Sequence, residues 1–265
     1  MYGKAGAMMK KVIILIVLLI MNMGCSKKKE VLDAKDNPDS VSFHAIVVSQ
    51  KEKSLMVVAN DEDKGFGRFE PIQVGYASDD LNVTMGDLIE IEFDGTILES
   101  YPCQIGADKI TVVKKAEGKW PASREIPENY PIDEAVRDHC FVVAFDKTES
   151  EDLLLRFLDH SQNGIVSYLR KVSYTIEGDP VITDFLFDGT KYYIFEDVTR
   201  DKFGSGELYK YEYQYINTYE TNTRKEIYFA NRNDISNTEY ENSKNGNNAN
   251  DFIDTYPLYN KIIIE

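Results

Sequence analysis

The stretch Asp87-Leu-Ile-Glu-Ile-Glu-Phe-Asp-Gly95 decides the fold of the first half of this 265-residue chain. Ile89, Ile91 and Phe93 alternate with acidic residues, so one side of an extended chain would be apolar and the other charged. This period of two predicts a half-buried β-strand. Asp94-Gly95 then predicts a hairpin turn, because glycine tolerates the positive φ that such turns require.

Shorter apolar runs occur before and after this strand in the sequence. They occupy residues 43–48, 55–58 and 110–113, each bounded by polar residues. About five short strands within residues 41–114 predict a small all-β barrel or sandwich. The tetrad Phe-Asp-Gly-Thr recurs at residues 187–190 without matching flanks, which indicates one kind of turn used in two hairpins and not a duplicated domain.

Proline and charge mark residues 115–136 as a linker to a second domain, residues 137–265. Thr148 and Glu151 have the spacing of a capping box, in which each side chain satisfies a free backbone N–H at a helix start. Asn163-Gly164 predicts the end of that helix. The strands expected in this half cover residues 140–145, 165–176, 181–187, 191–196, 209–215 and 258–264, and residues 242–250 read as a polar loop. A helix beside an antiparallel meander sheet predicts an α+β domain.

The N-terminus has the features of an export signal. Two lysines precede the unbroken apolar run 12–21, and a glycine comes just before Cys25. The pattern resembles the bacterial lipoprotein signal, although Asn22 stands where that signal usually has leucine. The resemblance implies a signal peptide over residues 1–24, lipidation of Cys25 and a tether over residues 25–40. An uncleaved signal anchor is the alternative, which the short apolar run disfavours.

Acidic residues dominate the charge, with 45 Asp and Glu against 30 Lys and Arg and a formal net charge of −15. Removing residues 1–24 takes away three lysines and no acid, which leaves −18. A field of this sign disfavours nucleic acid as a partner, because nucleic acid needs a basic face, and we expect none to bind. It also repels anionic lipid, so we expect membrane attachment through the lipid anchor, at the outer face of the cytoplasmic membrane.

Two sets of motifs resemble families that have no known activity. The first set is Gly86-Asp87, Phe93-Asp94-Gly95, Ile97, Glu99-Ser100-Tyr101-Pro102 and Gln104-Ile105. It is similar to a small β-barrel domain of uncharacterised Gram-positive lipoproteins. The second set is Tyr174–Pro180, Phe187-Asp188-Gly189 and Thr199–Gly204. It is similar to a second uncharacterised family of exported domains from the same bacteria. The resemblances imply location and domain layout and no activity.

The sequence contains no recognisable catalytic, metal or cofactor motif. Its three histidines, His44, His139 and His160, lack metal-ligand spacing, so we expect structural roles for them. We expect Cys103 and Cys140 to be buried free thiols, because two cysteines in different segments do not make a disulfide framework. The resulting prediction is no catalytic residue, no metal and no cofactor.

A cluster of charged residues is the first candidate for ligand binding. Asp179 precedes a predicted strand, and Asp197, Arg200 and Asp201 follow another, next to a glycine-containing loop. Loops of this kind carry many binding sites, so these side chains would line one. The alternative is a solvated loop without a ligand.

A stripe of tyrosines is the second candidate. Tyr211 and Tyr213 belong to a set of four that occupy every second position of residues 209–215, on one face of a strand. Exposed, these rings would stack on a sugar or a peptide. The alternative is that the face packs against the helix carrying Leu154 and Phe157.

The leading functional hypothesis is therefore a non-catalytic binding or accessory module, anchored by lipid outside the cell membrane, with an envelope component or a protein as partner. The alternative is a carboxylate-dependent hydrolase of cell-envelope material, with Asp179, Asp197 and Asp201 as its acidic residues. A third class, a regulatory partner of a membrane protein, would need an exposed apolar patch.

Overall fold

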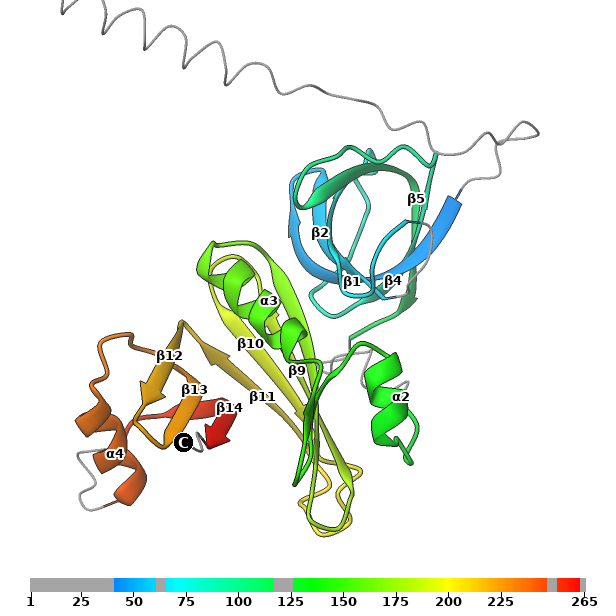
Figure 1. Ribbon diagram of the computed structural model, residues 1–265. Coiled ribbons are helices and arrows are strands. Elements are labelled where there is room, and N and C mark those ends of the chain that lie inside the picture. The colour runs from blue at the N-terminus through cyan, green and yellow to red at the C-terminus, as the bar shows by residue number, and fades with distance from the viewer. Residues whose placement is uncertain (1–40, 61–64, 117–125, 247–251, 263–265) are drawn as a thin grey trace, which may run out of the picture.

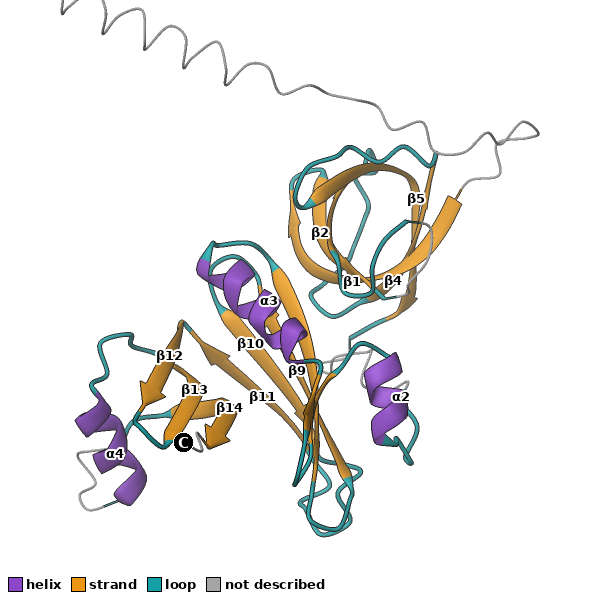
Figure 2. Cartoon of the chain, in the orientation of Figure 1, coloured by secondary structure: helices purple, strands orange, loops and turns teal. Residues whose placement is uncertain are grey.

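The computed structural model describes residues 41–60, 65–116, 126–246 and 252–262 (Figure 1). The predicted signal peptide, Cys25 and the tether lie outside the described residues. Among the described residues, strands account for 47% and helices for 13%. Three β-sheets with three helices make this an all-β fold (Figure 2). The prediction of a distinct α+β domain is therefore wrong, because β12 (Tyr215–Glu220) and β13 (Arg224–Ala230) join the predicted last strand in a third sheet, and no strand was predicted over residues 216–241.

The strands between residues 41 and 114 close into a barrel. They are β1 (Val41–Lys51), β2 (Ser54–Ala59), β3 (Pro71–Gly75), β4 (Leu88–Phe93) and β5 (Cys103–Lys114). Their order is β1-β2-β3-β5-β4, and β1 pairs with β4 to complete the closure. Strands β3 and β5 are parallel, and the other pairs are antiparallel. Of the two architectures left open, the structure has the barrel. A five-stranded closed barrel is the architecture of the OB-fold, which by itself assigns no ligand.

The alternation in β4 is confirmed. Ile89, Ile91 and Phe93 are buried inside the barrel, whereas the two glutamates between them are partly exposed. The Phe93 ring lies 5.9 Å from that of Phe43 on β1 and 6.1 Å from that of Phe66, measured between centroids. Three aromatic rings therefore contact one another in the barrel core.

Two sheets make up the second half. The large sheet contains β6 (Phe141–Val143), β7 (Thr148–Glu149), β8 (Ser167–Tyr174), β9 (Pro180–Phe187), β10 (Tyr192–Asp197) and β11 (Leu208–Tyr213), in the order β11-β10-β9-β8-β6-β7. The small sheet contains β12 (Tyr215–Glu220), β13 (Arg224–Ala230) and β14 (Thr255–Ile262). The helices are α2 (Ile132–Arg137), α3 (Glu151–Gln162) and α4 (Asn237–Asn245). Strands β8 to β11 form the expected antiparallel meander.

One face of the large sheet is covered by α3 and by the small sheet. Phe185 of β9 stacks on Phe229 of β13 with centroids 5.4 Å apart, and Phe157 of α3 lies 6.4 Å from Phe185. These rings belong to one apolar core that also contains Tyr213 and Leu258. The helix is thus one of two covers on a β-sandwich, which is why the second half is not an α+β layer structure.

The opposite face of the large sheet meets the barrel and α2. Tyr168 and Leu186 form a buried cluster with Ile46 and Val58, which lie on the outside of the barrel. Phe69, in the β2–β3 connection, brings its ring to 4.3 Å from that of Tyr168. Further along the same face, α2 covers a separate apolar cluster. The large sheet is therefore the middle layer of the molecule (Figure 1).

The repeated tetrad has the same turn chemistry in two different connections. Asp94 accepts a hydrogen bond from the backbone N–H of Thr96 at 2.8 Å, and Asp188 accepts one from Thr190 at the same distance. The second turn joins the paired strands β9 and β10 directly. After the first turn, however, the chain continues as a loop until Cys103. Strands β4 and β5 do pair antiparallel, so the predicted pairing is confirmed, but Asp94-Gly95 is not its whole connection. The side-chain contact fixes the local turn and not where the next strand starts.

Helix α3 begins later than its capping pattern predicts. Thr148 is part of β7, and the N-cap residue is Ser150, with φ 58° and no side-chain capping bond. Glu151 instead accepts a hydrogen bond from the hydroxyl of Tyr259 on β14, at 2.6 Å. Thr148 is thus engaged in strand pairing and Glu151 in a contact with a distant residue, so neither side chain caps the helix. The predicted end is confirmed, since Asn163 caps the helix.

Among the described helices, a capping box is found at α4 instead. Ser236 accepts the backbone N–H of Glu239 at 3.3 Å, and the Glu239 carboxylate accepts the N–H of Ser236 at 2.9 Å. Tyr240 anchors the helix by stacking on Tyr228 at 4.0 Å. The polar loop predicted over residues 242–250 is therefore wrong in its first part, and residues 247–250 lie outside the described residues. No helix in the described part of the chain is long and apolar enough to cross a bilayer.

Candidate functional site

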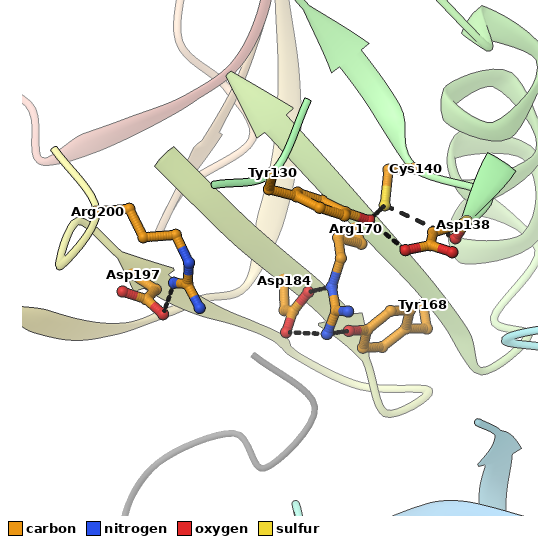
Figure 3. A network of polar contacts seen from close by, with 8 residues as sticks. All are labelled: Tyr130, Asp138, Cys140, Tyr168, Arg170, Asp184, Asp197 and Arg200. Atoms are coloured by element: carbon orange, nitrogen blue, oxygen red, sulfur yellow. Dashed lines mark hydrogen bonds and ion pairs between the residues drawn. The ribbon is translucent and has the colours of Figure 1, made fainter. Parts of the chain in front are cut away.

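The charged cluster lies at the end of the large sheet where β8 meets β9 and β10 leads toward β11. Asp197, the last residue of β10, accepts a hydrogen bond from Arg200 Nη1 at 2.6 Å (Figure 3). It also accepts the backbone N–H and the hydroxyl of Thr199, at 3.0 and 2.6 Å. The Asp197 and Arg200 side chains are only 7% and 8% exposed. Their ion pair is therefore a buried part of the scaffold.

Arg200 also holds a segment that the sequence analysis assigned to the linker. Its Nη2 donates to the carbonyl of Ile126 at 2.6 Å, and its Nε donates to the carbonyl of Pro127 at 3.1 Å. Nearby, the hydroxyl of Tyr174 donates to the carbonyl of Tyr130 at 2.7 Å. These bonds fix residues 126–130 against the end of the sheet and so build one wall of a groove.

Asp179 and Lys202 join the β8–β9 turn to the β10–β11 connection. Asp179 accepts the backbone N–H of Lys202 at 3.1 Å and its Nζ at 3.0 Å. These hydrogen bonds lower the pKa of Asp179. Asp201 accepts the N–H of Phe203 at 3.0 Å and closes the next turn. Asp179 is therefore ionised at neutral pH, which does not suit a general acid.

The space between these loops is a groove with a volume of about 650 Å³. We call it the turn groove. It is lined by residues 128–132, 144–146 and 174–180, with Arg200 and Lys202. Of the predicted cluster, Asp179 and Arg200 line it directly, Asp197 lies behind Arg200, and Asp201 supports the neighbouring turn. A concave surface built from several loops on a rigid sheet is the usual setting of a binding site.

Large apolar side chains surround the turn groove in an unusually exposed state. Phe145, in the β6–β7 turn, is 90% exposed, and Ile176, in the β8–β9 turn, is 83% exposed. Phe203, next to Lys202, is 79% exposed. Exposed apolar residues gathered at a groove mark interaction surfaces, because water contact there costs free energy that a partner can recover.

The charge around the groove is negative. Glu128, Asp146 and Glu177 are exposed and form no hydrogen bond or ion pair with the described residues. The two basic lining residues are each engaged by an aspartate. The pKa of Lys202 is raised by its hydrogen bond to Asp179 and, to a smaller degree, by the nearby charge of Glu128. The turn groove therefore presents apolar side chains together with three exposed carboxylates.

The tyrosine stripe lies on the face of the large sheet that the small sheet covers. Its four members are divided between these two sheets. Strand β11 ends at Tyr213, and Tyr215 begins β12. The Tyr213 side chain is 3% exposed and donates to Asp254 at 3.0 Å. Tyr211 is half-buried, with its ring 5.0 Å from Tyr256 of β14. The expected cover, α3, is thus replaced here by the small sheet.

A buried ion pair occupies the centre of the face that meets the barrel. Arg170 of β8 donates to both carboxylate oxygens of Asp184 on β9, at 2.7 and 3.1 Å, and to the hydroxyl of Tyr168 at 3.1 Å (Figure 3). The guanidinium carbon also lies 5.5 Å from the ring centroid of Phe69 on the barrel. Both charged side chains are at most 2% exposed, so the pair serves the packing of the two halves and not a ligand.

Cys103 and Cys140 are buried free thiols, as the sequence predicts. Cys140 lies 3.6 Å from the hydroxyl of Tyr130, which donates to Asp138 at 2.7 Å (Figure 3). Burial raises the pKa of both thiols, to about 11 for Cys103. They are protonated and unreactive at neutral pH. Among the described residues, no group of three or more His, Cys, Asp and Glu side chains is arranged to hold a metal ion.

Comparison with protein families adds one finding. Residues 138–228 match the model of a domain of unknown function, DUF4362. The match covers the large sheet, α3 and β12 and reaches into β13, so it includes every wall of the turn groove except residues 128–132. The prediction of an uncharacterised family over this part of the chain is confirmed, whereas lipoprotein status and bacterial origin stay predictions. No curated protein and no solved structure matches the chain.

Sequence reasoning missed the two residues that give the turn groove its apolar rim. Phe145 follows the end of a strand and precedes Asp146-Lys147, and Ile176 precedes Glu177-Gly178. Both positions belong to turns, which face solvent, so a large apolar residue there has no core to join. An apolar residue inside a polar turn was the signal that could have revealed them.

Proposed function

We propose that this chain is a non-catalytic binding module that holds a basic, apolar segment of a partner protein in the turn groove. The observation that carries the proposal is the exposure of Phe145 and Ile176, each followed directly by a carboxylate, Asp146 and Glu177. A partner with apolar side chains and neighbouring Lys or Arg residues would cover the rings and neutralise the acids together. Such a match provides both affinity and selection by charge.

The size of the exposed side chains sets the expected affinity. Covering one large apolar side chain contributes about 1.5–3 kcal/mol. Two or three such contacts give about 3–9 kcal/mol before the cost of ordering a flexible segment is subtracted. The expected complex is therefore weak and transient, and not a permanent one. The negative charge of the rim should attract a basic partner, so the association rate should fall as the salt concentration rises.

The fixed state of the three aspartates that the hydrolase hypothesis names supports binding over hydrolysis by these residues. Asp197 is buried against Arg200, Asp201 closes a turn, and Asp179 is held ionised by Lys202. A hydrolase of the expected kind needs two available carboxyl groups, one of them with a raised pKa. The proposal therefore assigns these aspartates to building the groove.

The proposal includes the location expected from the N-terminus. Cys25 would be lipidated and would hold the module, through the tether, at the outer face of the cytoplasmic membrane. The apolar run 12–21 and the glycine before Cys25 support this. In this layout the barrel, residues 41–114, stands between the anchor and the groove-bearing domain, residues 137–265.

The binding step can be tested with a matched pair of peptides. Both carry the same two phenylalanines, but one has lysines and the other glutamates at the remaining positions. A soluble chain, residues 25–265 with Cys25→Ser, should bind the lysine peptide and not the glutamate peptide. Phe145→Ser and Ile176→Ser should each weaken binding about tenfold or more. Phe252→Ser, at an exposed residue outside the groove, is the control. Equal binding of both peptides, or full binding by the groove variants, would refute the proposal.

The anchor has its own test, which does not depend on the groove. In a bacterial host that processes lipoproteins, the parent chain should stay with the membrane fraction after a high-salt wash. Cys25→Ser with a cleaved signal should appear in the soluble fraction, because the nearby lysines bind membranes only weakly against an acidic domain. A cleaved Cys25→Ser chain that remains on membranes would disprove the lipid anchor.

A further inference from the structure

A second cavity lies between the barrel and the large sheet, away from the turn groove. It has a volume of about 260 Å³, and we call it the interface cavity. It is lined by residues 67–71 and Tyr101 from the barrel, by Arg156, Phe157 and His160 from α3, and by Ser167 and Tyr168 from β8. Both halves of the chain therefore contribute walls to one partly open cavity.

Two buried polar atoms at this cavity have no hydrogen-bond partner. Ser167 is 3% exposed, and its Oγ makes no hydrogen bond. Arg68 donates from Nη1 to Asp138 at 3.3 Å, but its buried Nε has no acceptor. Buried polar groups in folded proteins are almost always satisfied, because leaving one unpaired costs folding free energy. Since both residues line the same cavity, they indicate a polar occupant.

The charge of the interface cavity differs from that of the molecule as a whole. The ionisable side chains that line it are those of Arg68, Arg156, His160 and Glu70, together with two tyrosines. Arg156 forms no ion pair with the described residues, while Glu70 accepts the backbone N–H of Gly67 at 2.7 Å. In a chain of net charge −15, this cavity carries more positive than negative groups.

Neutral donors and aromatic rings complete the walls. The Tyr101 hydroxyl lies 3.2 Å from Nδ1 of His160. Burial and the neighbouring Arg156 lower the pKa of His160, so the ring is neutral at neutral pH and offers hydrogen bonds and no charge. Phe69 and Tyr168, whose rings lie 4.3 Å apart, supply an apolar wall.

We propose that the interface cavity binds a small organic oxyanion, a carboxylate or a phosphate on a compact apolar body. The anion would take the unpaired N–H of Arg68, the hydroxyl of Ser167 and the charge of Arg156, and the body would lie against the aromatic wall. Charge-assisted hydrogen bonds of this kind are stronger than neutral ones. The volume fits a molecule smaller than a typical drug. Because both halves bind it, the ligand would also stabilise their contact.

Thermal shift and calorimetry on the soluble chain test this site with benzoate, inorganic phosphate and neutral benzamide at constant ionic strength. Benzoate or phosphate should raise Tm, and benzamide should not. A response to benzoate alone identifies a carboxylate ligand, and a response to phosphate alone a phosphate ligand. No response to either anion, or an equal response to benzamide, overturns the proposal.

Two variants locate the site. Arg156→Gln, on an exposed helix position, should weaken anion binding about tenfold without changing the Tm of the free protein. Ser167→Ala should also weaken binding but raise the Tm of the free protein, because it removes an unpaired buried group. Arg137→Gln, at an exposed arginine of α2, is the control. Anion binding that survives Arg156→Gln and Ser167→Ala unchanged refutes the assignment.

Discussion

The aromatic stripe of β11 and the apolar rim of the turn groove contain similar side chains in opposite surroundings. Tyr213 is 3% exposed, whereas Phe145 is 90% exposed. The stripe lies on a strand whose face is covered by the small sheet, with Phe229 and Tyr256 packed against it. The rim lies in turns beyond the last paired residues of the large sheet, and its apolar side chains stay exposed although residues 128–132 form a neighbouring wall. Burial is thus decided by the presence of a covering element and not by the hydrophobicity of the residue itself.

The largest expected effect is at Tyr213. Tyr213→Ala opens a cavity between the two sheets and should lower the free energy of unfolding by about 3–5 kcal/mol in urea melts. Tyr213→Phe keeps the ring and removes only the hydrogen bond to Asp254, so it should cost about 1 kcal/mol. A Tyr213→Ala curve that overlays the parent would mean that the small sheet does not cover this face.

The next largest expected effect is a difference in stability loss between Tyr211 and Tyr215, which belong to the same stripe. Tyr211→Ala should cost about 1–3 kcal/mol, because the half-buried ring contacts Tyr256 over part of its surface. Tyr215→Ala, at a residue 37% exposed on β12, should stay within about 0.5 kcal/mol. Equal losses at both positions would contradict the division of the stripe between two sheets.

Substitutions at the rim of the turn groove should leave stability nearly unchanged and weaken binding instead. Phe145→Ser and Ile176→Ser remove exposed side chains, so unfolding free energies should change by no more than about 0.5 kcal/mol. The same variants should lose the lysine-peptide binding described above. A stability loss as large as that of Tyr211→Ala would show that the rim residues are packed and would remove the argument for a binding surface.

The smallest expected effect is on the pH dependence of stability in acid. Lys202→Met removes the contact that lowers the pKa of Asp179, so that pKa should rise toward its ordinary value, as followed by NMR titration. A carboxyl with a lowered pKa stabilises the fold above its unfolded pKa. This contribution is lost as the pH falls through the lowered value, below about pH 4. The parent should therefore exceed Lys202→Met in stability at pH 7 and converge with it in acid. Lys210→Met, at an exposed lysine outside the groove, should leave the Asp179 titration unchanged.

The parts predicted correctly are those set by contacts close in sequence. Ile89, Ile91 and Phe93 alternate, so any strand there buries the same three side chains. Asn163 ends α3 as predicted, since a helix end needs only its own next residues. The capping pattern at Thr148 failed because β7 pairs with β6 and because Tyr259, far along the chain, takes the carboxylate of Glu151. A local pattern is reliable only where no distant partner competes for the same groups.

The sequence by itself determined four of the five barrel strands, at least in part, together with the meander from β8 to β11, the acidic charge and the signal-like N-terminus. Each of these depends on residue type and short spacing. Only the tertiary structure decided which aromatic residues are covered. It also brought Glu128, Phe145, Ile176 and Lys202 from four separate segments to one groove. The physical reason is that a side chain's exposure depends on which distant segment packs over it. That packing follows from the balance of all buried surfaces in the fold, which no local spacing contains.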